Sequence, residues 1–411
     1  MRAGSAAALA AVLIAFLCAG LWLGGHPNDL PRSVRDVFVD ESTTLSGEAA
    51  ETIEDHYYRG VSRDQLNNGS ITGMVNALRS RHKEDRFSHY FDPTQAQILN
   101  EQTSGRFTGV GLSVREVKRG LKVVEAFKGS PAAKAGIKPG DLIVSVNGKS
   151  ISGESSDLTT AKIKGPEGTD VMLGVVQAAS GNTRQLKLQR QEISTPVVES
   201  SIRRVGGDRL GYVHLSAFSD GAHGPLRDAT QRLERRGAEG IVLDLRGNPG
   251  GLLTEAVLTA SVFLPKHDKV VTTASRTEGR RVYMAAGDPL PRRPMVVLID
   301  RGTASAAEIL ASALADNGLA EVVGTRSFGK GLFQDLLDLS NGGELDLTVG
   351  EFFTADGISL APKGIQPDVY AKDNPQTKAD EGLQRALAVL EGEVVKQQGA
   401  VQGPVGKSPK R

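Results

Sequence analysis

The sequence predicts a multidomain chain of the α/β and α+β classes, with a helical N-terminal region, a β-rich middle and an α/β core. Three observations predict this. Apolar residues recur at spacings of three and four within residues 47–101, which is typical of helices. Short β-rich runs alternate with glycine turns over residues 105–192. From Leu210 to about Asp368, strands alternate with helices, as in an α/β sheet.

Composition bounds the function. The 411 residues suffice for two or three domains, and the net charge of +1 gives no reason to expect nucleic acid or an acidic substrate. The single cysteine, Cys18, excludes an intrachain disulfide and a cysteine-based metal site. His-Glu-x-x-His is absent, and His214 lies in an apolar stretch, where we expect a core or interface residue. We therefore expect no metal and no cofactor.

Residues 1–26 read as a targeting segment. The uncharged run 6–25 follows Arg2 and is about as long as one membrane span. We expect an uncleaved anchor. The alternatives are a signal peptide cleaved near Cys18-Ala19-Gly20, a lipidated Cys18 and a buried core helix. All but the last export the chain, so we expect an extracytoplasmic protein, in the periplasm or at the cell surface, membrane-anchored or secreted.

The remaining segments follow in order. After the targeting segment we expect a polar linker over 27–46, a helical region over 47–104, a β-rich domain over 105–192, an α/β core over 193–375, an amphipathic helix within 376–397 and a disordered tail over 398–411. In the core, the expected strands are 210–215, 240–245, 270–274, 294–299 and 321–324, and the expected helices are 225–236, 252–263 and 304–315.

A glycine-rich turn follows the buried strand at 240–245. Its residues Arg246-Gly247-Asn248-Pro249-Gly250-Gly251 lead into a helix. Backbone amides in such a turn can stabilise an oxyanion. A phosphate cradle is the poorer alternative, because neither the G-x-G-x-x-G nor the Gly-Lys-Ser/Thr pattern is present. A purely structural turn remains a third interpretation.

Ser305 is the candidate nucleophile. It lies where a strand meets an apolar helix, so free amides and the helix dipole favour negative charge beside it. The Ala306 amide is then a natural oxyanion donor. Taken alone, Ser305 is better explained as an N-cap, a common place for serine, and it is Lys330 that favours the nucleophile.

Lys330 is the candidate base. It stands between Gly329 and Gly331 ahead of an apolar run, which favours a buried approach. Burial lowers a lysine pKa, and a useful base needs a fall from about 10.4 to roughly 7–8. Gln334, four residues on, shares a strand face with Lys330 if the segment is extended, and its amide can then orient the amine. The string Ser327-Phe328-Gly329-Lys330 matches the penicillin-recognising S-x-x-K, but the flanking glycines argue against the helix needed there.

Residues 105–190 resemble a PDZ domain. The resemblance rests on four stretches: Gly109-Val110-Gly111-Leu112, Gly129-Ser130-Pro131-Ala132, residues 135–141 and Val146-Asn147-Gly148. Such a domain takes a C-terminal peptide as an added strand and holds its carboxylate on loop amides. Gly109 and Gly111 would form that loop, because glycine lets amides approach an anion closely. The alternatives are that the glycines only serve turns, or that the domain only scaffolds.

With these motifs in this order, residues 47–392 resemble the C-terminal processing peptidases, also called tail-specific proteases. Residues 85–90, 211–218 and 363–368 support the resemblance. It implies a ClpP/crotonase-like core, with Ser305 as nucleophile, Lys330 as general base and Gln334 orienting the lysine. The implied oxyanion donors are the amides of Ala306 and of Gly250 or Gly251.

In the PDZ-like domain, the resemblance matches Gly111 and Leu112 to the carboxylate loop. Where the family often has Ile-Arg-Gly, this chain has Ile163-Lys164-Gly165. Lys164 therefore replaces an arginine that senses substrate in some relatives.

The combined expectation is an exported serine endopeptidase that cuts proteins near their C-termini. Its partner is a protein or peptide with a free C-terminus; an activating adaptor and pairing of subunits through the helical ends at 47–101 and 380–397 are left open. The competing interpretation is a non-catalytic PDZ adaptor that keeps a protease fold as a scaffold. The presence of Ser305, Lys330 and Gln334 argues against it.

Overall fold

The computed structural model describes residues 41–83 and 85–401, which divide into two compact units. The smaller unit holds helices α3 (Glu41–His56) and α4 (Arg63–Arg81) and strand β1 (His89–Phe91), together with residues 336–347. In this unit β1 pairs antiparallel with the start of β18 (Glu344–Phe353). The expected targeting segment lies outside the described residues.

Two features of the smaller unit differ from expectation. Helix α3 begins at Glu41, inside the stretch expected to be a linker. The region expected to be helical is interrupted by β1, because the Asp85 carboxylate accepts from the amides of Phe87 and Ser88 at 3.2 and 3.1 Å. These bonds turn the chain away from a helix and into an extended segment. The helix pattern does not reveal this turn.

The larger unit contains the PDZ-like domain. Helix α5 (Pro93–Ser104) leads into it, and β2 (Arg106–Gly109) pairs with β9 (Gln191–Ser194) where the chain enters and leaves. Its main sheet and helices are β3 (Leu112–Val117), β4 (Gly120–Ala126), α6 (Pro131–Lys134), β5 (Leu142–Val146), β6 (Lys149–Ser150), α7 (Ser156–Ile163), β7 (Asp170–Val176) and β8 (Thr183–Gln189). Helix α6 begins as the sequence predicts, with Ser130 as N-cap and Pro131 at the first position.

The α/β core is built on a six-stranded sheet of order β10-β11-β12-β15-β16-β19. Every neighbouring pair is parallel except β10 with β11. The strands are β10 (Val198–Val205), β11 (Asp208–Leu215), β12 (Gly240–Asp244), β15 (Met295–Ile299), β16 (Glu321–Gly324) and β19 (Val369–Tyr370). The helices are α8 (His223–Arg235), α9 (Leu253–Ala260), α10 (Ala306–Asp316) and α11 (Glu381–Val401). The expected strands and helices are therefore present, but the strand expected over 270–274 lies in a different sheet, and α11 runs four residues past its predicted end.

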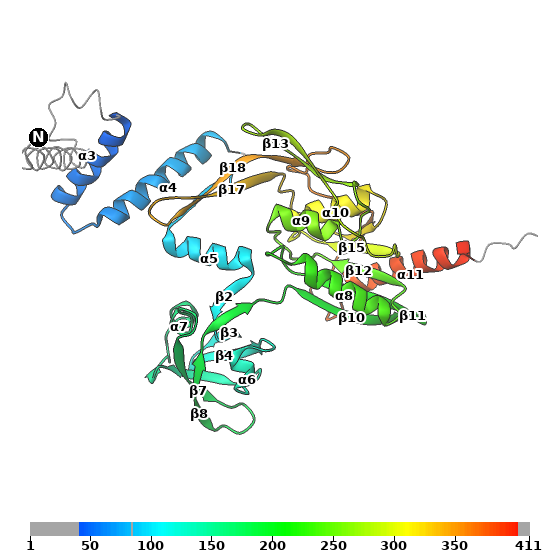
Figure 1. Ribbon diagram of the computed structural model, residues 1–411, viewed down its shortest axis with the longest axis horizontal. Coiled ribbons are helices and arrows are strands. Elements are labelled where there is room, and N and C mark those ends of the chain that lie inside the picture. Colours follow the sequence, from blue (N-terminus) through cyan, green and yellow to red (C-terminus); the bar gives the residue numbers. More distant parts are fainter. Residues whose placement is uncertain (1–40, 84, 402–411) are drawn as a thin grey trace, which may run out of the picture. The chain divides into compact units, whose positions relative to one another are not determined.

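Alternation along the strands divides the core into two layers (Figure 1). On β15, Val297 and Ile299 join the cluster formed with α8, α9 and α10, whereas Val296 and Leu298 join the cluster with α11. Successive strand residues face opposite sides, so an almost continuous apolar strand buries both faces. In the larger unit, β13 (Lys269–Ser275) pairs antiparallel with β14 (Gly279–Met284) and with residues 350–353 of β18. Residues 332–335 of this unit begin β17 (Leu332–Asp338).

Candidate active site

Ser305 lies at the carboxyl end of the central parallel strands, immediately before α10. Its backbone has φ 55° and ψ −120°, a combination that residues with a side chain rarely adopt. Such a conformation costs about 1–3 kcal/mol and tends to be kept where function needs it. The strain distinguishes Ser305 from an ordinary N-cap, whose backbone is normally extended.

The turn before Ser305 is fixed on two sides. The Thr303 hydroxyl donates to the Leu245 carbonyl at 2.8 Å, and the Ala304 amide donates to the Asn248 carbonyl at 3.0 Å. On the other side, the Phe328 amide donates to the Thr303 carbonyl at 2.9 Å. Three segments distant in sequence, namely the glycine-rich turn, the nucleophile turn and the lysine segment, therefore meet at one place.

The glycine-rich turn lies directly against Ser305. A Cβ atom added to Gly250 would come within 2.8 Å of the Ser305 Cβ and 2.9 Å of the Ala306 nitrogen, so only glycine fits. The Gly250 amide already donates to the Asn248 side-chain oxygen at 2.9 Å. The backbone of the turn therefore lies directly beside Ser305 and the first residue of α10.

Lys330 is half-buried, and both flanking glycines are explained by close packing. A Cβ on Gly329 would lie 2.7 Å from the Pro362 carbonyl oxygen, and one on Gly331 would lie 2.6 Å from the Ala361 Cβ. The segment 361–365 is held there by Ile365, whose amide donates to the Ser327 hydroxyl at 2.7 Å. The glycines therefore allow another stretch of chain to pass, and in doing so they fix the course of the lysine segment.

Glu308 joins the two candidate catalytic segments, and sequence reasoning missed it. Its side chain is fully buried in the first turn of α10. One oxygen accepts from the Ser305 amide at 2.9 Å and the Lys330 amide at 3.0 Å. The other accepts from the Ser327 hydroxyl at 2.5 Å and the Gly329 amide at 2.8 Å. The available signal was Ser-x-x-Glu at a helix start, the sequence signature of a capping box.

Glu308→Gln is expected to lower kcat by about a hundredfold or more, because a small displacement of catalytic groups has that cost. The glutamine NH₂ would face an N–H or O–H donor in place of an acceptor. The measurement is kcat and KM on a model substrate, with circular dichroism to verify folding. Glu234→Gln on α8, a glutamate that is half-buried where Glu308 is fully buried, is the control. A Glu308→Gln enzyme with wild-type kcat would contradict the role.

Gln334 and His214 both lie on strands. Gln334 lies on β17, and its amide donates to the Thr348 hydroxyl at 3.1 Å; Lys330 precedes this strand. The expectation that Gln334 orients the lysine stays a prediction. His214 lies on β11, with its Nδ1 3.2 Å from the Asp244 carbonyl oxygen, as a residue within the sheet.

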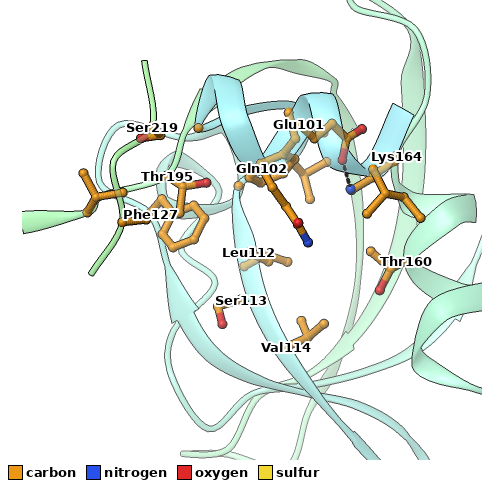
Figure 2. A pocket seen from close by; sticks show the side chains of 18 of the residues that line it. Glu101, Gln102, Leu112, Ser113, Val114, Phe127, Thr160, Lys164, Thr195 and Ser219 are labelled. Carbon is orange, nitrogen blue, oxygen red and sulfur yellow. Dashed lines mark hydrogen bonds and ion pairs between the residues drawn. The ribbon is translucent and has the colours of Figure 1, made fainter. Parts of the chain in front are cut away.

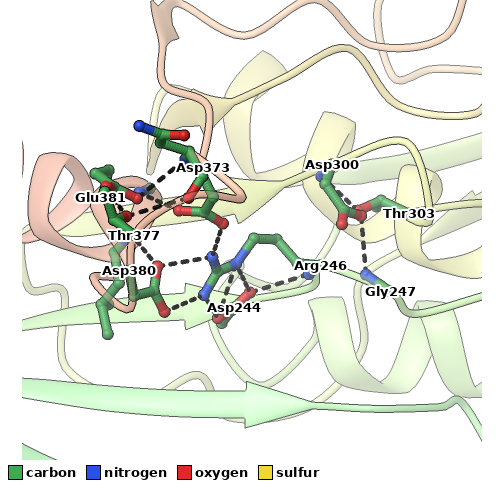
Figure 3. Close-up of polar contacts among 12 residues, drawn as sticks. Asp244, Arg246, Gly247, Asp300, Thr303, Asp373, Thr377, Asp380 and Glu381 are labelled. Carbon is green, nitrogen blue, oxygen red and sulfur yellow. Dashed lines mark hydrogen bonds and ion pairs between the residues drawn. The ribbon is translucent and has the colours of Figure 1, made fainter.

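A charged cluster around Arg246, the first residue of the glycine-rich turn, was also missed (Figure 3). Arg246 donates to Asp244 at 2.7 Å, to Asp380 at 2.8 Å and to Asp373 at 3.1 Å. Burial raises the pKa of the Asp380 carboxyl, but the bonds from Arg246 outweigh it and lower that pKa. Burial and the Asp244 charge raise the pKa of Tyr212, whose hydroxyl donates to Asp244 at 2.9 Å. The cluster ties the end of β12 to the start of α11.

The PDZ-like domain borders a cavity of about 670 Å³ (Figure 2). The predicted residues Gly109, Val110, Gly111, Leu112 and Lys164 all line it. Gly111 has φ 78°, and a Cβ there would meet the Ser130 side chain, so the loop requires glycine. Lys164 pairs with Glu101 of α5, and its amine lies 5.4 Å from the centre of the Phe107 ring.

Within residues 41–83 and 85–401, no group of three or more His, Cys, Asp or Glu residues could hold a metal ion. None of the helices in that part of the chain combines the length and apolar character that a membrane span requires.

Comparison with known proteins agrees with the geometry. Residues 209–371 match the model of peptidase family S41, and residues 122–177 match a PDZ domain model. The chain is 37% identical over 324 residues to carboxy-terminal processing protease CtpA of Bacillus subtilis, covering 79% of this chain and 68% of that protein. A probable CtpA-like serine protease of Staphylococcus aureus is 35% identical, covering 76% of this chain and 61% of that protein.

Among solved structures, the photosystem II D1 C-terminal processing protease is 30% identical with a TM-score of 0.48, covering 84% of this chain and 97% of that one. A putative S41 protease of Bacteroides fragilis is 17% identical with a TM-score of 0.50 and the same two coverages, a likeness of fold. By its sequence relatives and family models, the chain belongs to the C-terminal processing proteases of peptidase family S41, serine-type peptidases that here carry a PDZ domain.

Proposed function

We propose that the chain is an exported serine endopeptidase that cleaves proteins near their C-termini with a Ser305–Lys330 dyad. The observation that carries the dyad is the Glu308 carboxylate, one oxygen of which accepts from the amides of both residues. A single buried acceptor thus fixes both segments relative to each other. The export part rests on the uncharged run 6–25 of the sequence.

In the proposed reaction, the Ser305 hydroxyl attacks the scissile carbonyl carbon while the Lys330 amine takes its proton. The tetrahedral oxyanion is held by the Ala306 amide and by a glycine amide of the turn. We assign the second donor to Gly251, because the Gly250 amide donates to Asn248. Lys330 then returns the proton to the leaving amine, and water hydrolyses the acyl-enzyme through the same groups.

The test is cleavage of an unfolded protein with a free C-terminus, with the products identified by mass spectrometry. Products cut near that C-terminus by the wild type, and absent with Ser305→Ala, support the proposal. Binding without cleavage would favour the non-catalytic adaptor. Export is tested separately by fusing residues 1–40 to alkaline phosphatase, which is active only outside the cytoplasm.

Recognition of the substrate C-terminus is proposed for the cavity lined by Gly109, Gly111 and Lys164. Amidating a peptide's C-terminus is expected to weaken its binding by about tenfold or more, because charge-assisted hydrogen bonds to a carboxylate are strong. Fluorescence polarisation of both peptides on full-length Ser305→Ala measures this. Lys164→Met removes the charge and keeps an apolar stem, so it should weaken binding of the free acid alone. Equal dissociation constants for both peptides would exclude the role.

A further inference from the structure

The loop that joins β11 to α8, residues 216–222, contacts both connections to the PDZ domain. On the side where the chain enters the domain, the Asp220 amide donates to the Thr103 carbonyl at 2.9 Å. Gly105 is packed so closely that a Cβ on it would lie 2.6 Å from the Ser219 hydroxyl oxygen. On the side where the chain leaves, the Ser216 amide donates to the Val197 carbonyl at 2.9 Å. We call residues 216–222 the β11–α8 loop.

The same loop holds the glycine-rich turn. The fully buried Phe218 donates its amide to the Gly250 carbonyl at 2.9 Å and accepts from the Leu252 amide at 2.9 Å. These two bonds bracket Gly251, whose amide is the proposed oxyanion donor. Any shift of Phe218 would therefore move that amide, and an oxyanion donor must stay within a few tenths of an ångström to be effective.

Glu255 fastens the far end of the loop to the same helix that follows the turn. It lies in the first turn of α9 and is 3% exposed. Its carboxylate accepts from the amides of Gly221 and His223, both at 3.0 Å, and one oxygen lies 2.9 Å from the His223 Nδ1. Breaking this arrangement would leave the buried Glu255 carboxylate without its donors, which is costly. The loop is thus held to residues 250–255 at two points.

The cavity that the PDZ domain borders, from here on the PDZ-side cavity, is also lined by the β11–α8 loop. Besides PDZ residues, its lining includes Ser216, Ala217 and Ser219 of the loop and Pro249 of the glycine-rich turn. Figure 2 shows Ser219 beside the same cavity as Leu112 and Phe127. A peptide in this cavity can therefore contact the loop itself, which gives it a means to favour one loop position over another.

We propose that Glu255 is a positioning residue that couples peptide binding in the PDZ-side cavity to the Gly251 amide through the β11–α8 loop. The inference rests on the proposed function, because it assumes that Gly251 helps to hold the oxyanion. Glu255 touches neither substrate nor reacting atoms. It determines how strongly peptide binding in the cavity changes the position of the glycine-rich turn.

The experiment measures a coupling ratio on the full-length enzyme. A short fluorogenic peptide with an amidated C-terminus reports turnover with and without a saturating, protease-resistant peptide that has a free C-terminal carboxylate. In the wild type, the second peptide is expected to change turnover by about fivefold or more, a usual size for coupling between two sites. In Glu255→Gln the ratio should fall to near unity, while the dissociation constant of the resistant peptide is unchanged.

The matched control is Glu239→Gln. Glu239 also accepts from a backbone amide, that of Arg209 at 3.2 Å, but it lies before the amino end of β12, whereas the glycine-rich turn follows the carboxyl end of that strand. Its coupling ratio should equal that of the wild type. His223→Ala keeps both amide bonds to Glu255 and should give an intermediate ratio, which keeps the test valid if Glu255→Gln folds poorly.

Two results would overturn the inference: a folded Glu255→Gln enzyme with the wild-type coupling ratio, or a wild type whose turnover ignores the resistant peptide. If Glu255→Gln does not fold, a His223→Ala enzyme with the wild-type ratio would overturn it as well. Failure of the proposed function would look different, since the fluorogenic peptide would then not be hydrolysed in a Ser305-dependent manner by any variant.

Discussion

Replacing Ser305 by alanine is expected to abolish proteolysis while the fold survives. Losing the nucleophile of a serine peptidase typically lowers turnover by on the order of a millionfold. The fold should be kept because Ser305 contributes its backbone amide to Glu308, and alanine retains that amide. The measurement is single-turnover cleavage of a model substrate, together with thermal unfolding.

The matched control is Ser327→Ala. Ser327 is also a serine bonded to Glu308, but on the lysine segment, and its hydroxyl additionally accepts from the Ile365 amide. It should lose stability and part of the activity rather than all of it, because the deleted hydroxyl takes one donor from the buried Glu308 carboxylate and leaves the Ile365 amide without its acceptor. If Ser305→Ala cleaves within about tenfold of the wild type, when the nucleophile should be worth a millionfold, the assignment is wrong.

Much of the fold could be predicted because the core strands are short, apolar and separated by helical patterns. Residues 294–299 are predicted as a strand, and β15 forms there, buried on both faces. Strand β1 could not be predicted, because its partner β18 lies more than 250 residues away. Pairing at such separation leaves no trace in local periodicity.

The candidate active site likewise contains residues that the sequence predicts and one that it does not. Ser305 and Lys330 stand out because each lies in a local context that a motif describes. Glu308 does not, because its role depends on four donors from two segments, and only one of those donors is a near neighbour in sequence. The glycines at 329 and 331 correctly predicted a close approach of other chain to Lys330. The sequence could not show that this chain is residues 361–364, because only folding brings them there.

Replacing Lys330 is the second change expected to abolish activity. Lys330→Ala removes the proposed base, and Lys330→Arg should not restore it, because arginine stays protonated in proteins and cannot accept a proton. Both variants keep the backbone amide that donates to Glu308, so the fold should be retained. Rapid cleavage by the arginine variant would show that Lys330 is not the base.

The pH dependence of kcat/KM separates a lysine base from a histidine base. A base acts only when unprotonated, so cleavage should rise with pH as the amine loses its proton. A histidine base would instead give a rise near the ordinary histidine pKa of about 6.5.

His214 is the histidine to test, because it pairs on β11 with Asp244, the last residue of β12, after which the glycine-rich turn begins. His214→Ala should leave the profile in place, since the ring contacts a backbone carbonyl rather than either catalytic segment. Loss of cleavage in a stably folded His214→Ala protein would favour a histidine-assisted mechanism over the Ser-Lys dyad.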